Sequence, residues 1–124
     1  MMRHMAKARS FYAAATVDQL VEEVEFARLL RHRPEALIEA VQCARIFCVD
    51  VAGERRYPTF FADDSYRRRD LHQVSRRLGG LPGGSKLQFF IRPKAPLGGI
   101  TPLEALRRGA LANVLRAADG FAER

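Results

Sequence analysis

The sequence predicts a mainly α fold with one β-hairpin, in which a winged helix-turn-helix-like N-terminal part precedes a small C-terminal helical bundle. Apolar residues recur every three or four positions in several segments, and one aromatic, β-branched stretch is interrupted by a Gly-containing turn. With 124 residues and 48% hydrophobic content, the chain can bury one shared core. We place a flexible arm at 1–15, the winged helix-turn-helix-like part at 16–62 and the helical part at 63–124.

Two helices are expected at the start of the second part. Thr16–Gln19 has the pattern of a capping box, and the apolar spacing after it predicts a helix from about 17 to 32. Pro34 suits the first turn of a second helix that continues to Ala44. The two helices should pack as an antiparallel or angled pair.

A β-hairpin is expected next. Strands at 45–51 and 55–61 flank a turn at 52–54 that contains Gly53. Because Pro58 has no N–H to donate to a neighbouring strand, the second strand should lie at an edge of the sheet.

The last 60 residues carry helix start and stop signals. Residues 67–78 predict an amphipathic helix that Gly79 and Gly80 end, and Ser85 is the expected cap of another helix that ends before Pro93. Thr101 to Glu104 forms a further capping box, in which Glu104 should reach back to the cap. Gly109 should interrupt the chain before a final helix with Leu111, Val114, Leu115 and Ala118.

Positive charge is concentrated in the middle of the chain. The net charge is +7, and residues 45–94 hold eleven cations against five anions, whereas the segments on either side are nearly balanced. All but three of the 21 cations are arginine, whose planar fork suits phosphates and carboxylates. This distribution favours an anionic partner, although a basic surface that serves only solubility is the alternative.

Nothing in the sequence predicts an enzyme, a metal or a cofactor. Gly79 to Lys86 lacks the Gly-Lys-Ser/Thr order of a phosphate loop, and the adjacent carboxylates of Asp63 and Asp64 should cap the next segment. The three histidines have no metal-binding spacing. Cys43 and Cys48 are expected to be small core residues. No apolar run approaches the roughly 20 residues of a membrane span, and we expect a cytoplasmic protein.

The order of two helices and a basic hairpin suggests binding to double-stranded DNA. Carboxylates on the second helix, at Glu35 and Glu39, argue against tight reading of base sequence because they repel phosphate. The contacts should therefore be mostly electrostatic. The expected DNA-binding residues are Arg31, Arg33, Arg45, Arg55 and Arg56.

The segment 97–109, reading LGGITPLEALRRG, with Val114-Leu115 after it, resembles the Xre/MbcA/ParS-type toxin-binding domain of bacterial antitoxins. The hairpin segment 53–60 is similar to the wing that precedes this domain in short relatives, which carry a MerR- or excisionase-like reader. The resemblance covers about residues 45 to 118. We expect the partner-binding face on the 93–101 loop and the final helix. Its expected residues are Leu97, Gly98, Gly99, Ile100, Thr101, Pro102, Arg107, Arg108 and Arg116.

This resemblance implies a homodimeric antitoxin that occludes a partner toxin, often a RES-type toxin that consumes NAD, and that binds its own promoter. Two alternatives stay open. One is a DNA-binding transcriptional regulator without a toxin, which would bind duplex DNA alone in a strongly salt-dependent way. The other is a helical protein-interaction module whose DNA reader has decayed, which would have a partner but no DNA affinity.

Overall fold

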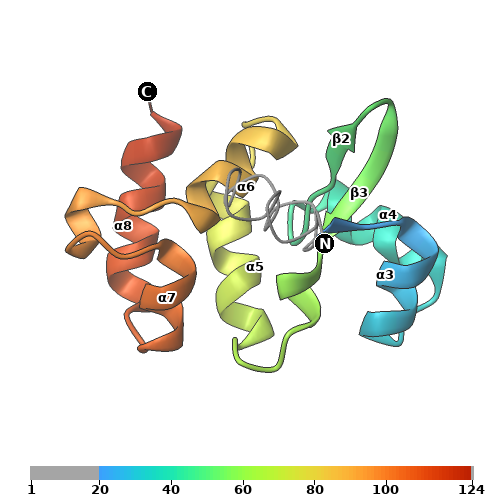
Figure 1. Ribbon diagram of the computed structural model, residues 1–124, viewed down its shortest axis with the longest axis horizontal. Coiled ribbons are helices and arrows are strands. Elements are labelled where there is room, and N and C mark those ends of the chain that lie inside the picture. The colour runs from blue at the N-terminus through green and yellow to red at the C-terminus, as the bar shows by residue number, and fades with distance from the viewer. Residues whose placement is uncertain (1–19, 124) are drawn as a thin grey trace, which may run out of the picture.

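A computed structural model describes residues 20–123 and confirms a mainly helical fold with a small antiparallel sheet (Figure 1). The arm expected at 1–15 and the capping box at 16–19 lie outside the described residues. The helices are α3 (Glu23–Leu30), α4 (Pro34–Gln42), α5 (Arg68–Arg77), α6 (Gly83–Ile91), α7 (Pro102–Arg107) and α8 (Leu111–Ala122). The strands are β1 (Leu20–Val21), β2 (Val49–Val51) and β3 (Glu54–Pro58), and the 3-10 turns are η1 (Thr59–Ala62) and η2 (Ala95–Leu97).

The elements follow one another along the long axis of the molecule. The helices α3 and α4 and the sheet occupy one end, α7 and α8 the other, and α5 and α6 lie between them (Figure 1). No helix between residues 20 and 123 is long and apolar enough to cross a membrane.

The first described element is a strand, where the sequence predicts a helix. Leu20 and Val21 pair antiparallel with the end of β3, and α3 begins only at Glu23. The predicted helix from residue 17 is therefore wrong at these two positions, because β3 offers backbone partners that a local propensity does not register. The helix ends at Leu30, two residues earlier than expected.

The β-hairpin is confirmed, but its strands are shorter than predicted and β3 is the central strand, in the order β1-β3-β2. The edge position expected for this strand is therefore wrong. Pro58 is the last residue of β3 and lies beyond the register with β2, which ends where Val49 faces Arg56. Its missing N–H thus interrupts no pairing with β2.

The predicted continuation of this strand to Phe61 is also wrong. Phe60 and Phe61 are both buried, with 4% and 1% of their surfaces exposed. A strand turns successive side chains to opposite faces, whereas the 3-10 turn η1 places both rings in the core. The expected strand at 45–51 starts only at Val49 for a related reason, since Ile46 and Phe47 are consecutive buried residues of a loop.

The C-terminal helices largely follow the sequence signals. The helix α5 ends before Gly79 as expected, and α8 begins after Gly109. Ser85 is not a cap, because α6 starts two residues earlier at Gly83. A Cβ atom on Gly83 would lie 1.9 Å from the carbonyl oxygen of Cys48, so only glycine permits this approach between α6 and the segment that leads into β2.

Aromatic residues form one core that joins the two ends of the fold. Phe90 of α6 packs against Phe47 and Phe60, with ring centres 5.9 and 4.9 Å apart, and Phe89 packs against Phe121 of α8 at 5.3 Å. The cysteines contribute less than expected: Cys43 is exposed at the end of α4, and Cys48 is half-buried.

Candidate functional site

The described arginines differ in whether a carboxylate neutralises them. Arg77 of α5 pairs with Asp119 of α8 at 2.7 Å, and Arg107 and Arg108 of α7 both pair with Glu104. In the hairpin, Arg56 pairs with Glu54 at 2.7 Å and with Glu22. The following arginines make no ion pair with a described carboxylate: Arg31, Arg33, Arg45, Arg55, Arg67, Arg68, Arg69, Arg76 and Arg116.

Several cationic side chains converge on a hollow of about 130 Å³ between α4 and α5, which we call the basic hollow. His32 reaches it from the α3–α4 turn, Arg45 from the segment after α4, and Arg68 and His72 from α5. Glu39 is the one carboxylate among its described lining residues. Its floor is apolar and includes Leu37, Ile46 and Phe61.

The positive charge around this hollow affects the pKa of His72. Partial burial, together with the positive charges of Arg45, Arg68 and Arg76, lowers the pKa of His72 below its ordinary value. The ring of His72 also lies 6.4 Å from that of Phe61. The positive charges that disfavour protonation of His72 would favour a bound anion.

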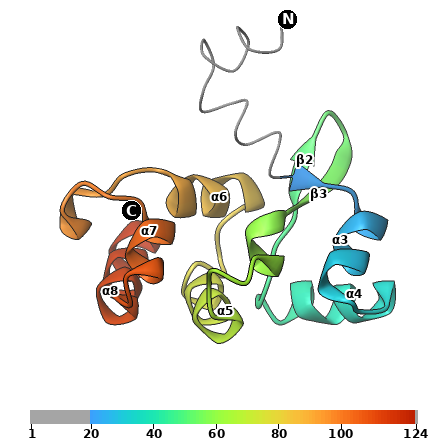
Figure 2. The same ribbon diagram turned by 60° about the horizontal axis from the view of Figure 1, so that its bottom comes forward.

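The five arginines predicted to bind DNA are not all brought together. Arg31 and Arg33 flank His32 in a shallow groove that adjoins the basic hollow, but Glu35 and Glu39 line the same groove. Arg55 and Arg56 belong to the hairpin. Its tip and the α3–α4 turn lie at opposite ends of the N-terminal half (Figure 2).

Sequence reasoning did not identify Arg68 and His72 as site residues. They lie four residues apart on a predicted helix, and this spacing places side chains on one helical face. The spacing was therefore available as a signal. The sequence did not show that Arg68 and His72 lie near Arg45, because Arg45 comes from another part of the chain.

The loop predicted to contact a partner is closed on itself. Lys94 and Ile100 form a backbone bridge across its neck, and Gly98 and Gly99 adopt left-handed φ angles of 75° and 88° that favour glycine. Leu97 and Ile100 are half-buried and pack against the core. Part of each side chain thus contacts the core of the protein and is not exposed to a partner.

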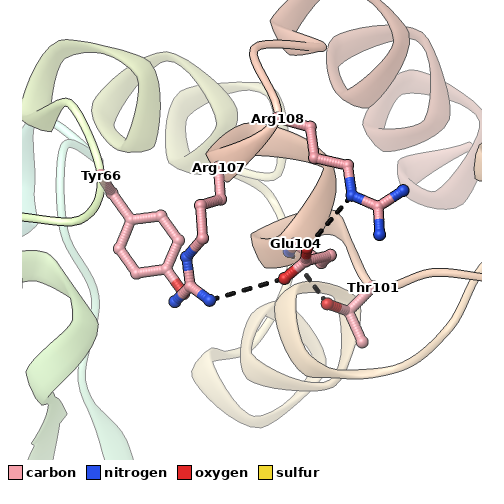
Figure 3. A network of polar contacts seen from close by, with 5 residues as sticks. All are labelled: Tyr66, Thr101, Glu104, Arg107 and Arg108. Atoms are coloured by element: carbon pink, nitrogen blue, oxygen red, sulfur yellow. Dashed lines mark hydrogen bonds and ion pairs between the residues drawn. The ribbon is translucent and has the colours of Figure 1, made fainter.

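Thr101, Arg107 and Arg108 belong to a polar network around Glu104 (Figure 3). The Thr101 hydroxyl accepts a hydrogen bond of 3.0 Å from the amide of Glu104, which confirms the N-cap, and Pro102 follows it in a buried position. The Glu104 carboxylate, expected to reach back to the cap, instead pairs with Arg107 and Arg108.

A second hollow, of about 220 Å³, separates the 93–101 loop from α8. Arg116 is the predicted partner-binding residue that lines it, and its guanidinium donates to the side chain of Asn113. Lys94 enters from the loop, with its ammonium 4.5 Å from the centre of the Phe121 ring. No carboxylate is found among the described residues that line this hollow.

Between residues 20 and 123 no three His, Cys, Asp or Glu side chains are grouped to hold a metal ion. Asp63 accepts a hydrogen bond of 2.8 Å from the amide of Ser65 within a turn, but the expected cap of the next helix is wrong, because Arg67 is the N-cap of α5 and no side chain caps it. Gly83 and Gly84, in the stretch compared with a phosphate loop, form the first turn of α6.

The fold defines a mainly helical domain that combines a helix pair, a hairpin and a C-terminal helical part. No protein-family model matches the chain, and curated proteins give no match. Among solved structures, the NMR structure of Rv2175c is similar, with a TM-score of 0.66 over 83% of this chain and 80% of that chain. The two sequences are 18% identical, so the likeness establishes a shared fold alone.

Proposed function

We propose that this chain is an antitoxin-like protein that binds double-stranded DNA through its N-terminal half and a partner toxin through its C-terminal helices. The observation that carries the proposal is the division of charge. Arg31, Arg33, Arg45 and Arg55 of the N-terminal half make no ion pair with a described carboxylate, whereas both arginines of α7 pair with the single carboxylate of Glu104. The N-terminal half is thereby suited to phosphates, whereas the positive charge of α7 is partly compensated within the protein.

Unpaired guanidinium groups support the DNA-binding part of the proposal. Each can release counterions from DNA when it reaches a phosphate, which is the main source of sequence-independent affinity. Arg55 lies exposed on the hairpin, where Asp50 faces it across the β2–β3 pair without forming an ion pair, whereas Arg56 is half-buried and paired. Arg55 is therefore the hairpin residue best placed to contact the backbone.

The hollow beside α8 supports the partner-binding part. It is concave, it is lined by Arg116, Lys94 and Phe121 among others, and it adjoins the loop whose sequence resembles the toxin-binding signature. Such a surface accepts an apolar segment that carries a carboxylate. From this resemblance we also propose a RES-type toxin as the partner and a homodimer as the state of the antitoxin.

DNA binding is tested with the purified protein and a fluorescent duplex. We expect affinity to fall steeply as salt is raised from about 50 to about 200 mM. Arg55→Ala should weaken binding severalfold, and Arg56→Ala, its matched control, should have a smaller effect because Glu54 and Glu22 already neutralise that side chain. An affinity that does not change with salt would contradict this part of the proposal.

Partner binding is tested by co-expression with the product of the neighbouring gene. Gly120 lines the hollow and has open space around it, so Gly120→Leu should fill the hollow and abolish neutralisation of the toxin. Ala112→Leu, at an exposed position of the same helix, is the control and should neutralise as the wild type does. Equal neutralisation by a folded Gly120→Leu variant would exclude this face.

One observation favours a second candidate, a helical interaction module without DNA affinity. Glu35 and Glu39 line the groove beside Arg31 and Arg33, and their charges offset those of the two arginines. If this candidate is correct, the wild type will bind its protein partner and will not bind duplex DNA at low salt.

A further inference from the structure

The basic hollow differs in charge from the groove that adjoins it. The groove beside Arg31 and Arg33 contains two carboxylates for its two arginines. The basic hollow contains two arginines and two histidines for one carboxylate, and Arg76 stands close enough to influence His72. It therefore keeps a net positive charge even when both histidines are neutral.

Its donors come from three separate segments and point to one place. Arg45 and Arg68 make no ion pair with a described carboxylate, so both guanidinium forks are available. A volume of about 130 Å³ is well above the roughly 10–15 Å³ that one water needs. A tetrahedral anion therefore fits.

We infer that the basic hollow holds one phosphate of the DNA backbone, with Arg45 and Arg68 as its main ligands and His32 and His72 as neighbouring donors. The inference rests on the proposed DNA binding and assigns it a position. The hollow lies on the α4–α5 face, so α5 takes part in DNA binding together with the helix pair and the hairpin. An arginine on α5 thereby acquires a role in holding the duplex.

The matched pair Arg68→Gln and Arg69→Gln tests this position. The two residues are neighbours on α5, both are exposed, and each substitution removes one unpaired charge, but only Arg68 lines the hollow. At about 0.15 M salt, charges more than about 8 Å from a phosphate are largely screened. Arg68→Gln should weaken duplex binding about tenfold and lower the salt slope by about one, whereas Arg69→Gln should change affinity less than about twofold.

The protonation of His72 gives a second readout that a merely structural residue would not change. The charged groups that act on it are Arg45, Arg68, Arg76 and His32, and Glu39 also lines the hollow. A bound phosphate should offset the positive charges, so the NMR titration of His72 should show a higher pKa with duplex than without it. The affinity for duplex DNA should accordingly increase as the pH falls through the pKa of His72.

The outcomes separate the two proposals. Equal losses in Arg68→Gln and Arg69→Gln, with wild-type binding intact, would overturn the hollow as a site and leave DNA binding standing. No duplex binding by the wild type would overturn DNA binding and this inference together. If inorganic phosphate raises the His72 pKa while Arg68→Gln binds the duplex as the wild type does, the hollow takes a free anion and the inference is wrong.

Discussion

The guanidinium of Arg107 donates a hydrogen bond of 2.8 Å to the hydroxyl of Tyr66 and lies 5.0 Å from the centre of that ring. The contact ties α7 to the segment before α5, two regions that are distant in the sequence (Figure 3). Arg107 is therefore a structural residue as well as a predicted partner-binding one. Arg108, next to it, pairs with Glu104 on its own helix.

This difference predicts unequal effects on stability. Arg107→Ala removes a cation–π contact and a hydrogen bond and should lower the free energy of unfolding by about 1 kcal/mol. Arg108→Ala removes an exposed ion pair and should change it by less than about 0.5 kcal/mol. Urea unfolding measures both. Similar values for the two variants would show that the Tyr66 contact is weak in solution.

The N-cap of α7 is the second test. Thr101→Ala leaves the amide of Glu104 without its side-chain acceptor and should destabilise the fold by about 1 kcal/mol. Thr101→Ser keeps the hydroxyl and should cost only a few tenths of that. Thermal melts of the two variants decide the matter, and an alanine variant that melts with the wild type would speak against a stabilising cap.

Gly83 and Gly84 should respond oppositely to alanine. A Cβ at Gly83 would meet the carbonyl oxygen of Cys48 at 1.9 Å, whereas nothing lies within 4 Å of one at Gly84. Gly83→Ala should therefore destabilise by about 1–3 kcal/mol, because backbone must move. Gly84→Ala should be neutral or stabilising by up to about 1 kcal/mol through helix propensity. Equal melting temperatures would mean that α6 does not approach Cys48 so closely.

Lys86 is a buried lysine whose ammonium lies 5.7 Å from the centre of the Phe47 ring. Burial lowers the pKa of Lys86 below 10.5, its ordinary value. Between the lowered pKa of the folded state and 10.5, the unfolded chain binds more protons at Lys86 than the folded chain does. The free energy of unfolding should therefore increase as the pH rises toward 10.5.

Lys86→Met should remove that component of the pH dependence and raise the melting temperature at neutral pH, because no charge is then buried. The measurement is the difference between wild-type and variant melting temperatures from pH 7 to about pH 10. A difference that stays constant over this range would contradict the assigned burial.

Glu39 should oppose DNA binding. It lines the basic hollow together with the two arginines, so Glu39→Gln should strengthen duplex binding by about two- to fivefold. Glu35→Gln is the control, because Glu35 lines only the adjoining groove and should have a smaller effect. Anisotropy titrations at one fixed salt concentration compare them. Weaker binding by Glu39→Gln would mean that this carboxylate orients a ligand instead of repelling it.

The sequence alone determined the features whose signals are local. The Thr101 cap, the end of α5 before Gly79 and the turn at Gly53 each depend on a few neighbouring residues, so propensity and capping rules suffice. The concentration of positive charge in the middle of the chain is likewise a property of composition, and it indicated an anionic partner without placing one.

Only the tertiary structure decided the strand at Leu20 and Val21, the central position of β3 and the basic hollow. The strand exists because β3 has a free edge to pair with, and the hollow exists because α5 packs beside the segment that carries Arg45. In each case the partners are distant in the sequence, and the free energy comes from contacts that form only when the chain is folded. A local pattern cannot report such contacts, since the same residues would satisfy a helix or an exposed surface equally well.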